Sequence, residues 1–273
     1  MMPIRRDLRF NLDPRKALRW HPQGAHVTQF FNTLSLFFPV GERFFIQAVR
    51  NYRDRIGDPE LEKAAAAFIG QEAMHGREHE TYNRHIADAG MPIAEYEARV
   101  ARLLKWVQNN TSKEMQLSAT IALEHMTALL GNALLGLDGV AGADPGYRRL
   151  WRWHALEETE HKAVAFDVWR AVVKRSPREY ALRSGGMIVA MIIFWPLVAQ
   201  YHIGFMRADK EASNHLAGYA KLLGWLYVKP GALRKLIPAW LDYFRPSFHP
   251  WQHDNRHVLA EIESLETELK LAA

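Results

Sequence analysis

The 273-residue sequence contains no cysteine. This absence excludes a disulfide scaffold, a cysteine-ligated zinc or iron–sulfur site, and catalysis by a thiol. A metal site in this chain would therefore use histidine and carboxylate ligands, and 13 histidines are available for it.

Strong charge of one sign is also absent. Lys and Arg number 35 against 30 Asp and Glu, and the net charge of +5 comes with no nucleic-acid-binding signature, so no nucleic-acid partner is expected. There is no dinucleotide fingerprint, so a reductant would come from a partner protein or a small molecule. We also find no Ser/His/Asp arrangement for a hydrolytic nucleophile.

The basic segment 1–20 lacks the apolar run of a signal peptide, which predicts a cytoplasmic protein. Segment 185–199, GGMIVAMIIFWPLVA, has no charged side chain. At 15 residues it is shorter than the roughly 20 that a membrane-spanning helix needs. It is expected to be a buried or cavity-lining helix, with a helix that rests on a membrane surface as the alternative.

The apolar residues recur with helical periodicity almost throughout, which predicts an all-α fold. Three N-capping patterns mark helix starts. The predicted helices run from Asp58-Pro59 to Gly90, from the capping box at 111–114 to Gly136 and Gly139, and from Asp144-Pro145 to Ser176-Pro177.

Further helices are expected over 27–38, ended by Pro39, and from Gly41 to about Gly57. Three or four more follow Pro177, the last over about 256–271. No linker divides the chain, so 1–273 is predicted to be a single domain. Within it, a bundle of four long helices occupies about 41–176, and 177–273 forms a C-terminal helical extension.

Two Glu-x-x-His motifs, Glu72–His75 and Glu158–His161, lie on these helices. Residues three apart share a helix face, so the carboxylate and the imidazole of each motif can reach one metal ion. Each motif begins 14 residues after an Asp-Pro helix start, which places the two motifs at the same height on their helices.

A single glutamate precedes each motif on an apolar helix. Glu42 lies 30 residues before Glu72, and Glu124 lies 34 before Glu158. A Glu from each of two helices and Glu-x-x-His from two others is the ligand set of ferritin-like dinuclear carboxylate bundles. In that arrangement Glu72 and Glu158 bridge two metals, Glu42 and Glu124 are terminal ligands, and each motif histidine binds one metal.

Other histidines lie near the motifs. His154, one turn before Glu158, is predicted to be a seventh ligand, and His79 is expected to have an outer role. His125 points away from Glu124. The series His249, His253, His257 is interrupted by Pro250 and is expected to have loop or helix-cap roles.

The blocks FPVGERFF, FIGQEAMHGREHETYN, ALEHMTALL and WHALEETEHKAVAFDVW resemble the bacterial family of predicted metal-dependent hydrolases. This resemblance covers about residues 27–250. The pattern from His154 to His161 also resembles the site of di-iron arylamine N-oxygenases. That second resemblance implies a metal-binding role for His154 and chemistry with oxygen.

The first functional hypothesis is a dinuclear carboxylate enzyme, with iron as the metal, that activates dioxygen to oxidise a hydrophobic small molecule or acyl substrate. An electron-donor protein would then be a partner. The alternatives are a hydrolase that uses water activated by two metal ions, with manganese or zinc in place of iron, and a non-catalytic metal-binding bundle. Contact of 185–199 with a membrane surface and a homodimer remain open.

Overall fold

The computed structural model describes residues 2–212 and 215–272, and these residues form helices and connections without any strand, which confirms the all-α prediction. The α-helices are α1 (Ala25–Arg50), α2 (Pro59–Asp88), α3 (Ile93–Asn110), α4 (Lys113–Gly136), α5 (Pro145–His161), α6 (Val164–Val172), α7 (Pro177–Ala208), α8 (His215–Tyr227), α9 (Ala232–Asp242) and α10 (Glu261–Ala272). Short 3-10 turns lie at Pro14–Lys16, Arg53–Arg55, Pro250–Gln252 and Arg256–Ala260.

Asp58 and Asp144 are N-caps as predicted, whereas the third helix start is capped by Ser112 and not by Thr111, the residue that a capping box over 111–114 would use. The side chains of Asp58, Ser112 and Asp144 each accept a hydrogen bond from a backbone N–H in the first turn of α2, α4 and α5. Such bonds satisfy donors that a helix start otherwise leaves without a partner. Gly90, with φ of 91°, follows the end of α2 as predicted.

The expected break at Pro39 is wrong, because α1 continues through it. A proline within a helix cannot donate to the carbonyl four residues earlier, which here belongs to Ser35. Asn83 of α2 supplies the missing donor, since its Nδ2 donates to the Ser35 carbonyl oxygen at 3.2 Å. The first helix of the bundle therefore begins at Ala25 rather than near residue 41.

The predicted helix from Asp144 to Ser176 is two helices in the structure. α5 ends at His161 and α6 begins at Val164. At the break, the Lys162 ammonium donates to the backbone oxygen of His253 and to Asn255 Oδ1, at 2.7 and 2.6 Å. His161, the last ligand candidate, consequently lies at the C-terminal end of α5.

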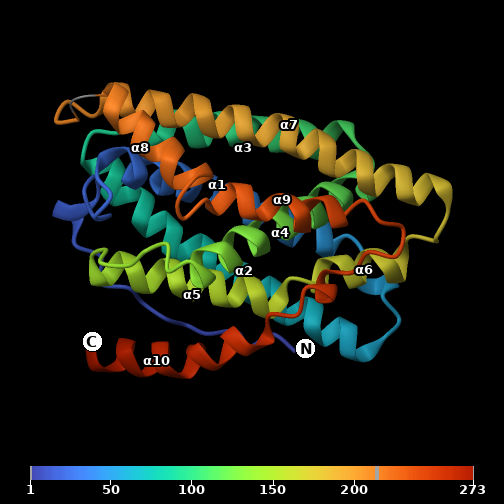
Figure 1. Cartoon of the computed structure of the whole chain (residues 1–273). Helices are drawn as coiled ribbons and strands as arrows, with labels where there is room; N and C mark the ends of the chain where they lie inside the picture. Colours follow the sequence, from blue (N-terminus) through green and yellow to red (C-terminus); the bar gives the residue numbers. More distant parts are fainter. Residues whose placement is uncertain (1, 213–214, 273) are drawn as a thin grey trace.

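The helices pack as two pairs. α1 lies along α2 and α4 lies along α5, while α3 forms the connection between the pairs (Figure 1). α4 and α5 approach closely at Gly131, where an added Cβ would lie 3.2 Å from the backbone of Ala155. The outer helix α7 packs on α4 and α1, and α10 packs on α5 at the other side of the molecule (Figure 1).

Two apolar clusters fill the bundle. One contains Leu36 and Tyr82 with the first half of α5, and the other contains Phe44 and Phe68 with α6. The predicted ligand residues lie between these clusters along α1, α2 and α5. The core therefore has a buried polar layer with apolar packing above and below it.

Candidate metal centre

The structure brings all seven predicted ligand residues into this layer. Each of the seven residues is at most 3% exposed. They come from α1 (Glu42), α2 (Glu72, His75), α4 (Glu124) and α5 (His154, Glu158, His161). Residues far apart in sequence thus meet where four helices face one another.

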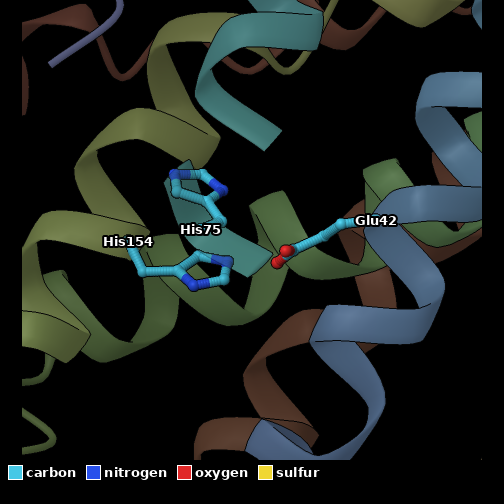
Figure 2. Close-up of side chains that lie close together, drawn as sticks. All are labelled: Glu42, His75 and His154. Atoms are coloured by element: carbon cyan, nitrogen blue, oxygen red, sulfur yellow. The ribbon is translucent and has the colours of Figure 1, made fainter. Parts of the chain in front are cut away.

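The seven residues form three overlapping groups that could hold metal ions. The groups are Glu42, His75 and His154; Glu72, Glu124 and His161; and Glu72, His75 and Glu158, each with one potential ligand atom per residue within 4.8 Å of the others. Figure 2 shows the first group, in which the Glu42 carboxylate points from α1 toward the two imidazoles. The shared members join the three groups into one cluster.

Two carboxylates lie between the motif histidines. Glu72 Oε1 is 3.1 Å from His161 Nε2 and 3.8 Å from His75 Nδ1. Glu158 Oε1 is 3.7 and 3.8 Å from the same two nitrogens. Glu124 approaches His161 alone among these histidines, at 3.5 Å. Two carboxylates thus approach both motif histidines, whereas Glu124 approaches one of them.

Most of the potential ligand atoms in the cluster lack hydrogen-bond partners. Both carboxylate oxygens of Glu42, Glu72 and Glu124 are buried without one, as are His75 Nδ1 and His161 Nε2. A buried polar atom left without a partner costs about 1–3 kcal/mol, and more when it is charged. The concentration of such atoms at one place, all of them metal-ligand types, shows that the donor set fits metal ions.

Burial controls the charge of the cluster. It raises the pKa of Glu42, Glu72 and Glu124 well above the usual range, and the neighbouring carboxylates add to this rise. Burial also acts to raise the pKa of Glu158, but contacts with His154 and His161 outweigh it and hold that pKa well below the usual range. Burial and mutual repulsion thus oppose negative charge on Glu42, Glu72 and Glu124, and bound cations would offset both effects.

Residues outside the cluster orient the motif histidines. His75 Nε2 donates to Glu157 Oε2 at 3.1 Å, and His161 Nδ1 donates to Gln71 Oε1 at 3.0 Å. These bonds leave His75 Nδ1 and His161 Nε2 facing the cluster. The sequence predictions missed both partners, although each directly precedes the glutamate of a Glu-x-x-His motif.

The N-terminal segment supports these outer residues. The Arg6 guanidinium binds Glu160 with bonds of 2.8 and 3.0 Å and Glu157 at 3.2 Å. Gln71 Nε2 donates to Glu160 and to the backbone oxygen of Ile4. Burial raises the pKa of Glu157 to about 8, with Arg6 acting in the opposite direction. No local sequence signal marks this role, since more than 150 residues separate Arg6 from Glu157 and Glu160.

His154 contacts both the cluster and an outer polar chain. Its Nε2 lies 3.1 Å from Glu158 Oε1, and its Nδ1 hydrogen-bonds with His79 Nε2 at 2.7 Å. His79 Nδ1 in turn bonds with Ser35 Oγ at 2.8 Å. His79 therefore lies behind His154 and outside the three groups, in the outer position expected for it.

The remaining histidines singled out from the sequence lie elsewhere. His125 stacks on Tyr243 and points toward α9, as expected. His249 caps the 3-10 turn at Pro250–Gln252 and pairs with Asp167, and His253 pairs with Asp242. These histidines lie outside the polar layer.

An apolar cavity of about 250 Å³ reaches the cluster. Apart from Glu42 and two threonines, its lining side chains are apolar or glycine. One of these threonines, Thr127, donates from Oγ1 to Glu158. The cavity extends to Trp106 of α3 and to Val189 and Ile193 of α7, all of which are exposed. It therefore connects the polar layer with the surface between α3 and α7.

A family model described as predicted metal-dependent hydrolase matches residues 4–254. The chain belongs to this family. The match includes every helix that contributes to the cluster and begins just before Arg6, in the segment that supports the outer residues. No curated protein and no solved structure matches the chain. The predicted resemblance to the hydrolase family is confirmed, and the resemblance to arylamine N-oxygenases stays a prediction.

Proposed function

We propose that this protein is a dinuclear metal-dependent hydrolase that acts on a substrate with an apolar chain. The observation that carries the proposal is the convergence of buried, unpartnered carboxylate and imidazole atoms at the inner end of an apolar cavity. Membership of the family of predicted metal-dependent hydrolases supports the reaction class.

In this proposal α1, α2, α4 and α5 form a ferritin-like bundle. Its support is the pairing of α1 with α2 and of α4 with α5, with one glutamate and one Glu-x-x-His motif from each pair. Glu72 and Glu158 would bridge two metal ions, because each lies between the two motif histidines. Glu124 and His161 would be the remaining ligands of one ion. Glu42, His75 and His154 would be those of the other.

Two ions bound here would activate water and polarise a scissile ester or amide bond. The chain itself supplies the other requirements. The apolar walls hold the chain of the substrate and exclude bulk water, while Thr127 keeps the Glu158 carboxylate in place. Glu157 and Gln71 hold the motif histidines in the orientation that turns one nitrogen of each toward the cluster.

Metal stoichiometry and ester hydrolysis test the proposal together. The purified protein should contain about two metal ions per chain and hydrolyse nitrophenyl esters. Its kcat/KM should rise by about fourfold per added methylene until the cavity is filled, since each buried methylene contributes about 0.8 kcal/mol.

Glu72→Ala and Glu158→Ala should each reduce the metal content well below two ions and remove the activity. Full loading in both variants would overturn the dinuclear model. His154→Ala distinguishes a site with six protein ligands from one with seven. Unchanged metal content and spectrum in this variant would show that His154 is not a ligand. A metal-loaded protein that neither hydrolyses esters or amides nor consumes oxygen would favour the non-catalytic bundle.

Oxygen activation is the second candidate. It is favoured by the third histidine at the cluster and by the aromatic rings around it, with Phe38 centred 4.4 Å from the His154 ring and Trp153 4.8 Å from the His75 ring. Bulky apolar walls suit chemistry that must exclude water. Iron as the bound metal, together with oxygen consumption after ferrous iron is added, would select this candidate over hydrolysis.

A further inference from the structure

The outer side of α7 is apolar and open to solvent. Ile188, Val189, Ile192 and Ile193 are 47, 54, 66 and 38% exposed. Only 22% of the most apolar 18-residue window of this helix is buried by the described part of the chain. A soluble monomer seldom leaves such a continuous apolar stripe uncovered, so this face calls for a partner.

α7 has the length and composition to cross a membrane, but its packing indicates that it lies flat. Its inner side packs along α4 and α1 and lines the cavity described above. Arg183, fully buried near its start, donates to the backbone oxygen of Arg245, and His202 near its end hydrogen-bonds with the backbone oxygen of His26. One side of the helix is thus fixed to the bundle over its whole length while the other faces outward.

α8 and α9 continue the apolar surface. A groove lined by Trp195 of α7, Tyr227 of α8 and Ile237 of α9 joins the three helices. Leu223 of α8 and Leu241 of α9 are each 54% exposed. In Figure 1, α7 runs along the side of the molecule away from α10, and α8 and α9 follow one another below it, across the middle of the view. The exposed surface is therefore wider than one helix.

The charge of this region is unlike that of the remaining chain. Residues 177–245 contain nine Lys and Arg against four Asp and Glu. The net charge of this region, +5, is therefore as large as that of the whole chain. Two of the four acids, Glu179 and Asp209, are buried, whereas Lys221, Lys229 and Lys235 are exposed. Exposed basic side chains on the same helices as exposed apolar ones are a composition typical of segments that bind anionic lipid surfaces.

We propose that the α7–α9 face docks on the surface of an anionic lipid bilayer, with α7 lying in the plane of the interface. Val189 and Ile193 lie both on this face and at the mouth of the apolar cavity. Docking therefore places the mouth against the lipid, where a molecule with an apolar chain can enter without passing through water. That entry route rests on the function proposed above, whereas docking itself does not.

Vesicle flotation of the purified full-length chain tests the docking. We expect the protein to float with vesicles of phosphatidylcholine and phosphatidylglycerol and to bind at least tenfold more weakly to phosphatidylcholine alone. Ile188→Glu with Ile192→Glu should weaken binding by at least tenfold, and Lys221→Ala and Lys235→Ala by about fivefold each. Neither isoleucine lines the cavity that reaches the cluster.

The matched control is Leu271→Glu, which places the same charge at an 86% exposed leucine on α10 and should leave vesicle binding unchanged. Metal content and hydrolysis of a short, soluble ester are measured on each variant as well. These two measurements test the proposed function independently of vesicle binding. Absence of wild-type binding to either vesicle would overturn the docking. A dimer in sedimentation that the double isoleucine variant dissociates, without vesicle binding, would assign the face to a second copy instead.

Discussion

At the residue scale, each motif histidine is held by a side chain from the helix of the other motif. Gln71 of α2 binds His161 of α5, and Glu157 of α5 binds His75 of α2. The two outer residues occupy equivalent places, directly before Glu72 and Glu158. The chemistry differs, because a neutral amide accepts from one histidine and a carboxyl group accepts from the other.

Replacing Glu157 tests whether this outer contact tunes the cluster. Glu157→Ala should weaken metal binding by about 10–100-fold, the usual effect of losing the group that orients a ligand histidine. Chelator competition measures the affinity. Glu263→Ala, an exposed glutamate on α10, is the control. Equal affinities in the two variants would show that the contact with His75 does not affect the metal.

At the element scale, the continuity of α1 depends on a side chain of α2. Pro39 leaves the Ser35 carbonyl without its helical donor, and Asn83 donates to that oxygen instead. Leu36, Glu42 and Phe44 therefore lie on one continuous helix, which brings Glu42 into the polar layer. A broken α1 would have rotated Glu42 relative to the other ligands.

A double-mutant cycle in urea measures this dependence. Asn83→Ala should lower the free energy of unfolding by about 1–3 kcal/mol, since it leaves a buried carbonyl without a donor. In the Pro39→Ala background the backbone N–H of residue 39 can bond to Ser35, so the same substitution should cost less. Equal costs in both backgrounds would contradict the compensation.

α7 forms one wall of the cavity, which allows the substrate length to be changed from this helix. Ala190→Phe should fill part of the cavity and shift the preference toward esters with shorter chains, while the metal content stays the same. Ala199→Phe places the same ring on an exposed position of the same helix. The two variants are compared by kcat/KM across a series of chain lengths, and identical profiles would exclude this cavity as the substrate site.

At the scale of the whole molecule, the polar layer divides the hydrophobic core. Two apolar clusters stabilise the bundle on either side, while four buried carboxyl groups between them lower its stability. The N-terminal segment closes over this layer through Arg6, which also binds Glu266 of α10. Arg6 thus links α10 to the residues around the polar layer.

Metal binding should therefore stabilise the whole molecule. Removing metal with a chelator should lower Tm by about 5–10 °C, since ligand at 100 times its Kd contributes about 2.7 kcal/mol and each kcal/mol shifts Tm by about 2–4 °C in a protein of this size. Calorimetry with and without chelator measures the shift. Glu72→Ala serves as the control, because its Tm should respond little to the chelator.

The sequence alone was sufficient for the all-α class, the starts of α2, α4 and α5, and the two Glu-x-x-His motifs at matching heights. These features depend on neighbours within a few residues, since a cap bonds within the first turn and residues three apart share a helix face. The hydrolase family was likewise evident from short sequence blocks. The ligand role of the seven residues remains a prediction that the geometry makes testable.

Tertiary structure decided the features that depend on contacts between helices. The donor to the Ser35 carbonyl oxygen comes from Asn83, 48 residues later, and the partner of His161 lies 90 residues away in Gln71. The exposure of α7 likewise depends on which of its sides packs against α1 and α4. Such contacts follow from how helices rotate and cross when they pack, and no local pattern in the sequence encodes that geometry.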